Sequence, residues 1–374
     1  MILTYNNKKT EQEILENTPK VKLKHIKGNN SSKNKLFQGD NLPILKTILE
    51  DYKLRNKVDL IYIDPPFATN GHFRISTDRA NTISQGSNDS IAYSDILIGD
   101  DYLEFLRERL IFLRELMSDK ASIYLHIDYK IGHYIKVIMD EIFGKNNFRN
   151  DITRIKCNPK NFKRKAHGNI KDLILFYSKS DNHTWNDIKI PYTEKDTERL
   201  FKKSDKNGRR YTTIPLHAPG ETNNGKTGQE WRGIKPPKGR HWRSKPEVLE
   251  ELDNNNLIEW SSSGVPRKII YADEKKGKKI QDIWEFKDPQ YPCYPTEKNC
   301  ELLKFIIRNS SNEGDLILDC FCGSGTTLAA AQETGRNWIG IDNSEIAIDA
   351  AIKKLLKTPK SLFANNDDYE LIKQ

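Results

Sequence analysis

The stretch Leu316-Ile-Leu-Asp-Cys-Phe-Cys-Gly-Ser-Gly-Thr-Thr327 decides the fold of this chain. Its first residues are apolar and predict a buried strand, and a helix is predicted from Thr327 to Thr334. Two glycines, at positions 323 and 325, lie between these elements. They allow the backbone to approach a ligand closely, and the helix amino terminus behind them favours polar or anionic groups. The stretch therefore predicts a ligand-binding turn between a strand and a helix.

The residues of this turn indicate which ligand it binds. A nucleoside-triphosphate loop requires a lysine that this stretch lacks, and a dinucleotide site requires a third glycine. Asp319, at the strand end, suits a cofactor that has an amino-acid part and no phosphate. The next strand ends at Asp342, where a carboxylate can accept hydrogen bonds from ribose hydroxyls. The predicted cofactor is S-adenosyl-L-methionine, and the alternative is a turn that serves only tight packing.

A second motif, Asp64-Pro-Pro-Phe67, follows the apolar run Val58–Ile63, which is predicted to be a buried strand. Asp64 and a carbonyl oxygen of the Pro65-Pro66 segment can each accept an N–H bond of an exocyclic amino group, which aims the nitrogen lone pair at a methyl donor. Prolines keep this carbonyl array rigid and without donors. Phe67 offers a face on which an extruded base can stack. In this interpretation Asp64 orients the amine and need not be a strong base; the alternative is a simple Pro-Pro turn.

Strands and helices alternate in two separated parts of the chain, which predicts a parallel α/β sheet interrupted by an insertion. The predicted parts are a loosely packed arm (1–33), a catalytic half (34–150), the insertion (151–290) and a cofactor-binding half (291–374). Helices are expected at 102–117, 132–142, 299–310 and 327–334, and strands at 58–63, 121–127, 316–321 and 337–341. The polar stretch 71–100 is expected to be a long loop, which could close over an extruded base.

Positive charge is concentrated in the insertion. The chain has 61 Lys and Arg against 52 Asp and Glu, and residues 151–290 hold 30 of the former against 20 of the latter. Excess positive charge in one segment suits a phosphate backbone, and arginines can read guanine edges in the major groove. The insertion is therefore predicted to bind double-stranded DNA; the alternative is a solvated basic surface. Its tryptophans and nearby basic residues are Trp185, Trp231, Trp242, Trp260 and Trp284, with Arg232, Arg240, Arg243 and Lys245.

Cysteine usage and hydropathy argue against several other classes of protein. The five cysteines (157, 293, 300, 320 and 322) form no CxxC pair, so neither a disulfide framework nor a metal site is predicted. Cys320 and Cys322 are expected to be packing residues. No apolar run is long enough to cross a bilayer and no cleavable signal is recognisable, so no membrane partner and a cytoplasmic location are expected.

The order of the two motifs resembles the β class of DNA amino-methyltransferases, in which the catalytic motif precedes the cofactor motif. Gly39-Asp40-Asn41 and Tyr294-Pro-Thr-Glu-Lys298 are similar to further segments of that family. Tyr124–Asp128 and Met139–Gly144 resemble segments of the modification subunits of type III restriction systems. The resemblance implies a Rossmann-like S-adenosylmethionine-dependent methyltransferase fold with circularly permuted motif order and an inserted target-recognition domain.

The resemblance also implies roles for individual residues. Asp40 is expected to contact the cofactor adenine, and Thr296 and Lys298 its methionine end. The other expected cofactor contacts are Asp319, Phe321, Gly323, Ser324, Gly325, Thr326 and Asp342. The expected catalytic residues are Asp64, Pro65, Pro66 and Phe67.

The Asp of the second motif usually accompanies transfer to N6 of adenine in this family, and Ser usually accompanies transfer to N4 of cytosine. Site-specific methylation of adenine N6 in duplex DNA, after base flipping, is therefore expected. The alternatives are cytosine N4 methylation, RNA base methylation, and a DNA-binding protein without catalysis. The resemblance further suggests a homodimer and a cognate restriction endonuclease as partners.

Overall fold

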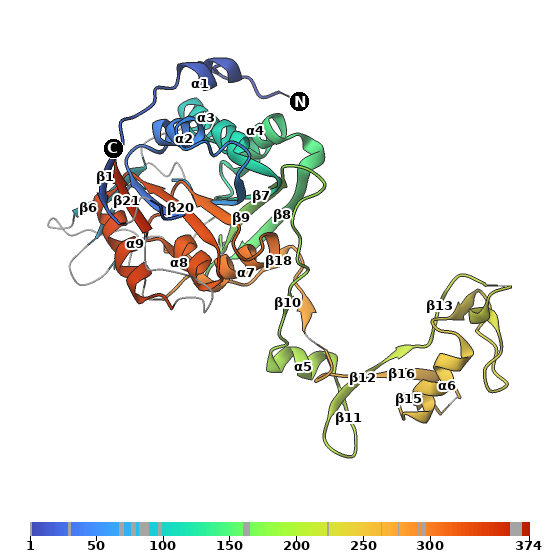
Figure 1. Cartoon of the computed structure of the whole chain (residues 1–374). Helices are drawn as coiled ribbons and strands as arrows, with labels where there is room; N and C mark the ends of the chain where they lie inside the picture. The colour runs from blue at the N-terminus through green and yellow to red at the C-terminus, as the bar shows by residue number, and fades with distance from the viewer. Residues whose placement is uncertain are drawn as a thin grey trace. The chain divides into compact units, whose positions relative to one another are not determined.

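The computed structural model describes residues 2–28, 31–66, 99–159, 165–222, 224–262, 264–275, 277–290, 292, 297–359 and 369–374, and the backbone alone of 71–75, 80–81 and 90–95. The chain divides into two compact units (Figure 1). Unit 1 comprises Met1–Ile188 and Gln281–Gln374, and unit 2 comprises Lys189–Ile280.

Unit 1 is built on a ten-stranded sheet. Its strands, in spatial order, are β1 (Lys24–Lys27), β21 (Tyr369–Lys373), β2 (Asn34–Gln38), β20 (Asn337–Asp342), β19 (Leu316–Asp319), β3 (Val58–Ile63), β7 (Met117–Ile127), β9 (Lys171–Ser178), β8 (Phe148–Ile155) and β18 (Ile283–Trp284). The six strands from β21 to β7 are parallel, whereas β9 runs antiparallel to both of its neighbours. The near-continuous burial of β3 and β19 is typical of parallel strands that are covered on both faces.

Two groups of helices cover the sheet (Figure 1). One group consists of α2 (Asn41–Glu50), α3 (Gly99–Leu116) and α4 (Gly132–Phe143), and the other of α7 (Cys300–Ser310), α8 (Thr326–Glu333) and α9 (Glu345–Lys357). The main hydrophobic core lies between the sheet and the first group. In the part of the chain that the structure describes, no helix is long and apolar enough to cross a membrane.

The strands and helices that the sequence predicts are present within a few residues of their expected bounds. The insertion, however, is smaller than the predicted 151–290. Strands β8 and β9 belong to the central sheet, and β9 is buried along almost its whole length. These two strands pair antiparallel, with no helix between them in the described part of the chain. The prediction placed the end of the sheet where the alternation of strands and helices stops, and it therefore missed them. The compact insertion, unit 2, begins at Lys189.

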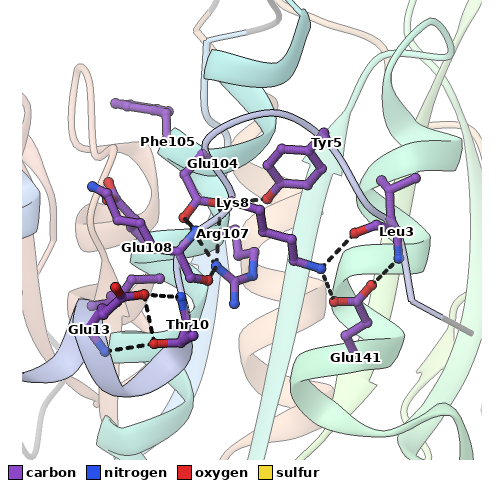
Figure 2. A network of polar contacts seen from close by, with 12 residues as sticks. Leu3, Tyr5, Lys8, Thr10, Glu13, Glu104, Phe105, Arg107, Glu108 and Glu141 are labelled. Atoms are coloured by element: carbon purple, nitrogen blue, oxygen red, sulfur yellow. Dashed lines mark hydrogen bonds and ion pairs between the residues drawn. The ribbon is translucent and has the colours of Figure 1, made fainter.

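The N-terminal segment is attached more firmly than the predicted loosely packed arm. It contains α1 (Glu11–Asn17), whose Ile14 is buried in the main core. The Tyr5 hydroxyl donates to Glu104 Oε2 over 2.5 Å, and Lys8 Nζ donates to Glu141 Oε2 over 2.6 Å (Figure 2). The segment is therefore held on α3 and α4 by ion pairs and hydrogen bonds. Isolated polar and charged residues make these contacts, and such residues form no periodic pattern from which the contacts could be predicted.

Part of the predicted loop 71–100 has strand backbone. Strands β4 (Gly71–Ile75), β5 (Ala80–Asn81) and β6 (Ser90–Asp95) form a separate antiparallel sheet in the order β5-β4-β6. The other residues from 76 to 98 lie outside the described part of the chain.

Unit 2 has a small core of its own. Its elements are β10 (Lys189–Ile190), α5 (Glu194–Leu200), β11 (Lys203–Ser204), β12 (Arg210–Pro215), β13 (His217–Pro219), β14 (Arg240–Trp242), α6 (Pro246–Asn254), β15 (Ile258–Trp260), β16 (Pro266–Tyr271) and β17 (Lys278–Lys279). Trp231 and Trp242 are buried in its core with Leu216 and Leu249. Trp260 is more exposed and stacks on Trp231. Two of the insertion tryptophans are thus core residues of unit 2.

Glu104→Ala is expected to lower the free energy of unfolding by about 3–5 kcal/mol, because the removal of one partner leaves the other charge buried. That other charge is Arg107, which is only 5% exposed and donates to Glu104 Oε1 over 3.1 Å (Figure 2). Denaturant unfolding monitored by circular dichroism measures the effect.

Glu108→Ala is the matched control on the same helix. Glu108 pairs with Lys9, whose side chain is 54% exposed, so its loss is expected to cost only about 0–1 kcal/mol. Equal effects of the two changes would contradict a structural role for the Glu104 contacts.

Candidate active site

The two motifs of the sequence meet at one edge of the sheet. Strands β19 and β3 are adjacent and parallel, and Ile317 and Leu318 pair with Leu60 and Ile61. Along the chain, the next strand of this sheet after β19 is β20 and the next after β3 is β7, and these two lie on opposite sides of the pair. Such a reversal of strand order leaves a crevice at the carboxyl ends of the strands, where open α/β sheets bind their ligands. Asp319 and the Asp64 motif therefore lie together at the expected binding edge.

The two carboxylate oxygens of Asp64 differ in the contacts that they make with the described residues. Its Oδ2 forms an ion pair with Lys298 Nζ. Its Oδ1 is buried and has no hydrogen-bond partner among the described residues. A buried oxygen without a donor costs free energy, and native structures rarely retain one without a reason. The geometry thus leaves one buried acceptor, on a carboxylate held by Lys298, for which the described residues supply no donor.

A side chain of α3 forms a hydrogen bond with the proline segment after Asp64. The hydroxyl of Tyr102, which is buried, donates to the carbonyl oxygen of Pro66. Pro65 is buried as well. Tyr102 was not expected to contribute to the site, because an apolar face on a helix indicates only core packing. Phe67 lies outside the described residues.

The glycine turn has the geometry that its sequence predicts. Gly323 and Gly325 adopt φ angles of +49° and +75°, which favour glycine. Asp319 braces the turn, because its Oδ1 accepts from the Phe321 backbone N–H over 3.0 Å and its Oδ2 accepts from the Thr327 hydroxyl over 2.5 Å. Burial raises the pKa of Asp319 to about 7, against the lowering effect of these two hydrogen bonds.

Asp342 closes the turn from the neighbouring strand. Its Oδ2 accepts from the Gly323 backbone N–H over 2.8 Å, and its Oδ1 accepts from that of Ser344 over 2.9 Å. Burial raises the pKa of this carboxyl above its ordinary value. Each oxygen has a second lone pair, so the predicted ribose contact is compatible with these bonds.

The Gly39-Asp40-Asn41 segment lies directly beside the glycine turn. Asn41 Nδ2 donates to the carbonyl oxygen of Cys320 over 2.7 Å, and Asn41 Oδ1 accepts from Arg109 Nε over 2.5 Å. Arg109 also pairs with Asp40 Oδ1 at 3.1 Å. Arg109 is 5% exposed and links the two segments, although nothing in the helix pattern distinguished it from a solvated arginine.

The hydroxyls of the glycine turn are held by a lysine that the sequence analysis did not single out. Lys354 Nζ donates to Ser324 Oγ over 3.0 Å and to Thr326 Oγ1 over 2.7 Å, and it pairs with Glu297 at 2.6 Å. Lys354 thus connects α9, the turn and the segment before α7. Thr296, expected at the methionine end of the cofactor, lies outside the described residues.

The cysteines beside the turn are packing residues, as expected. Cys320 and Cys322 are buried, and Cys320 belongs to the main core. Burial raises the pKa of both thiols, which keeps them protonated and unreactive.

A doubly wound sheet with a glycine turn and an Asp-Pro-Pro motif at its switch point is the architecture of an S-adenosyl-L-methionine-dependent methyltransferase. The chain matches the DNA methylase family of N6 and N4 methyltransferases over residues 58–353, and it belongs to that family. It is a DNA methyltransferase of the restriction–modification kind, and S-adenosyl-L-methionine is its cofactor.

Two relatives and one solved structure illustrate what the chain is similar to. The chain is 41% identical over 330 residues to the type II methyltransferase M.EcaI of Enterobacter cloacae. The aligned region covers 86% of this chain and 69% of the relative. It is 27% identical over 359 residues to the Mod subunit of the type III enzyme StyLTI of Salmonella typhimurium, with 86% and 53% coverage, so it spans about half of that subunit. The solved PvuII DNA methyltransferase, which is cytosine-N4-specific, aligns at 12% identity with a TM-score of 0.48 over 92% of each chain.

Gly325→Ala is expected to weaken S-adenosyl-L-methionine binding by about tenfold or more, equivalent to at least 1.4 kcal/mol. A Cβ at this position would lie 2.8 Å from the Cβ of Ala351, so the turn or α9 must shift. Calorimetric titration with the cofactor measures the loss.

Gly314→Ala is the matched control. Gly314 also has a positive φ, +83°, but an added Cβ meets nothing within 4 Å. The control carries the backbone strain without the clash and is expected to bind the cofactor normally. A similar loss in both variants would show that the close approach at Gly325 does not shape the cofactor site.

Proposed function

We propose that this chain transfers the methyl group of S-adenosyl-L-methionine to N6 of adenine in double-stranded DNA. The observation that carries the proposal is the buried Oδ1 of Asp64, which has no donor among the described residues. It lies at the carboxyl end of β3, in the strand next to the one that leads into the glycine turn. An exocyclic amino group is the kind of donor that this acceptor lacks.

The amino group of a base is a poor nucleophile, because its lone pair is delocalised into the ring. Two acceptors at its hydrogens favour a pyramidal nitrogen and direct the lone pair at the methyl group. Asp64 Oδ1 is one acceptor. The Pro65 carbonyl is favoured as the other, because the Pro66 carbonyl already accepts from Tyr102. Lys298 holds Asp64 Oδ2 and so fixes the direction of Oδ1. Such orientation is the main contribution that we assign to the protein.

The residues around the glycine turn suit the cofactor. We assign the backbone of the turn between Asp319 and Thr326 to the methionine part of the cofactor. We assign Asp342 to its ribose and Asp40 to its adenine. Phe321, whose ring lies 6.1 Å from that of Phe105, adds apolar surface. When bound, the cofactor supplies the methyl group on a sulfonium leaving group.

Adenine N6 is favoured over cytosine N4 by Asp64 alone, because Asp at this position usually accompanies adenine in the resembling family. The same two acceptors would also serve cytosine N4, which stays the alternative. Either nitrogen takes part in base pairing inside a duplex, so the base has to be flipped into the site.

Unit 2 is proposed to recognise the DNA sequence. It has 21 Lys and Arg against 13 Asp and Glu, but many of these charges are paired with one another. Arg232, a candidate DNA-contacting residue in the sequence, pairs with Glu250 and Asp253. Arg209 likewise pairs with Asp273 and Glu274.

A second set of arginines in unit 2 is available for phosphate. Arg240, Arg243 and Arg267 have no carboxylate partner among the ion pairs of the described residues. They lie near His217, whose pKa is lowered first by burial and then by these three arginines. This cationic cluster is the part of unit 2 that best suits the phosphate backbone of DNA.

A cognate restriction endonuclease and a second copy of the chain are the further proposed partners, and the cytoplasm is the proposed location. The type III relative is named as the Mod subunit of a restriction–modification enzyme. Co-purification of an endonuclease and light scattering of the isolated chain test these two partners.

The proposed reaction is tested with labelled S-adenosyl-L-methionine and unmethylated duplex DNA, followed by digestion to nucleosides. The label is expected on N6-methyladenosine. Asp64→Ala is expected to abolish transfer, because the amino group loses its charged acceptor, while cofactor binding is retained. Label on N4-methylcytosine would overturn the choice of base, and loss of cofactor binding in the variant would mean that Asp64 is a structural residue.

Replacement of Arg240 and Arg243 together by Gln is expected to weaken DNA binding and to reduce the slope of log affinity against log salt by about 0.9 for each lost phosphate contact. Fluorescence anisotropy across a salt series measures both quantities.

Replacement of Arg209 and Arg232 by Gln is the control with the same change of charge. These two arginines already pair with carboxylates, so their loss is expected to leave the slope almost unchanged. Equal effects of the two double variants would contradict the assignment of the unpaired cluster to DNA.

A further inference from the structure

A row of buried polar side chains crosses the sheet behind Asp64. Its buried members are Tyr62 on β3, His126 on β7 and Asp172 on β9. The partly exposed Lys156, directly after β8, ends the row. His126 is fully buried, and Asp172 is 3% exposed. Buried ionisable groups cost free energy, and a well-packed apolar row would often be at least as stable. The position of the row, next to the carboxylate that acts on the substrate, suggests that it contributes to the reaction.

The contacts of His126 define which of its nitrogens carries the proton. His126 Nε2 lies 3.2 Å from Asp172 Oδ2, and Nδ1 lies 2.8 Å from the Tyr62 hydroxyl. Burial alone would raise the pKa of Asp172, but hydrogen bonds from His126 and Lys156 bring it well below its ordinary value. Asp172 is therefore a carboxylate and only accepts. A neutral His126 then has its proton on Nε2 and a lone pair on Nδ1, which accepts from Tyr62.

The Nδ1 edge of His126 faces Asp64 as well as Tyr62. Nδ1 lies 3.9 Å from Oδ1 of Asp64, the same oxygen that has no donor among the described residues. A movement of about 1 Å by either side chain brings the two atoms within hydrogen-bonding distance. Among the described residues, the charged or titratable groups that face His126 are Tyr62 and Asp64 on one side and Asp172 on the other, with Lys298 beyond Asp64. Two cations, Lys156 and the buried Arg154, pair with Asp172 behind it.

We propose that His126 takes up, through Asp64, the proton that the amino group loses when it is methylated. The inference rests on the proposed amino-methyltransferase function. The nitrogen lone pair forms the N–C bond to the methyl group, and the C–S bond breaks with its electron pair going to sulfur. As the N–C bond forms, the N–H proton of the nitrogen moves to Asp64 Oδ1 and from there to Nδ1 of His126, so proton release is part of the chemical step. The Tyr62 hydroxyl, which donates to Nδ1 before the transfer, rotates away and frees that lone pair. The transfer restores the Asp64 carboxylate and forms an imidazolium held by Asp172.

The surroundings of the two groups favour this direction of transfer. Asp172 Oδ2, 3.2 Å from His126 Nε2, stabilises an imidazolium, and Lys298, paired with Asp64 Oδ2, stabilises the Asp64 carboxylate. Burial lowers the pKa of His126, whereas Asp172 and Asp64 oppose that change. Lys156, whose side chain is 28% exposed, connects Asp172 with the surface of the protein. His126 and Asp172 act through Asp64 and are therefore positioning residues rather than catalytic ones.

The inference predicts how the chemical step depends on pH. His126 accepts a proton only in its neutral form, so the single-turnover rate should be full above its pKa. The rate should fall as the pH decreases through that pKa, which lies below the ordinary value because of burial. We call this fall in rate at low pH the acid limb. A purely structural histidine would not produce an acid limb in the chemical step.

The decisive experiment is single-turnover methyl transfer across pH 4.5–8.5 (about two units on each side of an ordinary histidine) with enzyme in excess over duplex DNA. His126→Gln is expected to lower the rate by about 100-fold, as for the loss of a general base, and to abolish the acid limb. Asp172→Asn is expected to be similarly slow, because an amide can donate to Nε2 and so favour the tautomer whose Nδ1 is already protonated. Cofactor affinity and the unfolding midpoint are measured for each variant.

Lys156→Met keeps the inference testable if a buried variant fails to fold. Lys156 Nζ lies 2.7 Å from Asp172 Oδ1. Without this cation Asp172 stabilises the imidazolium more strongly, so the acid limb should move to higher pH. Lys136→Met is the control, because Lys136 pairs with Asp140 at 2.7 Å outside the row and is similarly exposed, at 32%. The control should leave the limb in place.

The outcomes separate this inference from the proposed function. A wild-type protein that transfers no methyl group to either base overturns the proposed function itself. A wild-type protein that is active, with folded His126→Gln and Lys156→Met variants that keep its rate and its acid limb, overturns the inference alone. A slow His126→Gln variant that retains the acid limb also contradicts it, because the limb would then belong to another group.

Discussion

The parallel pairing of β19 with β3 is the constraint on which the rest of the structure depends. These strands are more than 250 residues apart in the chain, yet Ile317 and Leu318 pair directly with Leu60 and Ile61. The pairing brings the glycine turn and the Asp64 motif to one edge, where Lys298 can reach Asp64. The insertion leaves and re-enters unit 1 near β8, β9 and β18, at the far end of the sheet from β21. Unit 2 can therefore vary without disturbing the pairing that forms the site.

Three carboxylates gather at this edge, and their surroundings give them different roles. Both oxygens of Asp319 and of Asp342 accept hydrogen bonds from the turn and its flanking backbone, so these side chains hold the turn in shape. Asp64 Oδ2 pairs with Lys298, whereas its buried Oδ1 has no hydrogen-bond donor among the described residues and lies 3.9 Å from His126 Nδ1. The distribution of hydrogen bonds, rather than the number of acidic groups, is the basis of our proposal that Asp64 acts on the substrate.

The sequence predicts the parts of this molecule that depend on local chemistry. Periodicity identifies β3 and α4, and the glycines at 323 and 325 identify a turn that needs positive φ. Contacts made across the fold by single side chains leave no such signal: Arg109, Lys354 and Tyr102 look like ordinary helix residues, yet each fastens part of the site. The boundary of the insertion was misplaced for the same reason, because β8 and β9 join the sheet through pairing partners that local sequence does not specify.

The buried polar row gains a physical explanation from the reaction itself. Methylation of a neutral amine releases one proton in every turnover, and the nearest cation, Lys298, disfavours any further positive charge beside it. A proton that stayed on Asp64 would remove the carboxylate that orients the next amino group. A neutral imidazole behind Asp64, held in one tautomer by Asp172, offers that proton a site one step further from the substrate. In this proposal, the buried His126 and Asp172 are retained in spite of their free-energy cost because they return Asp64 to its carboxylate form after each transfer.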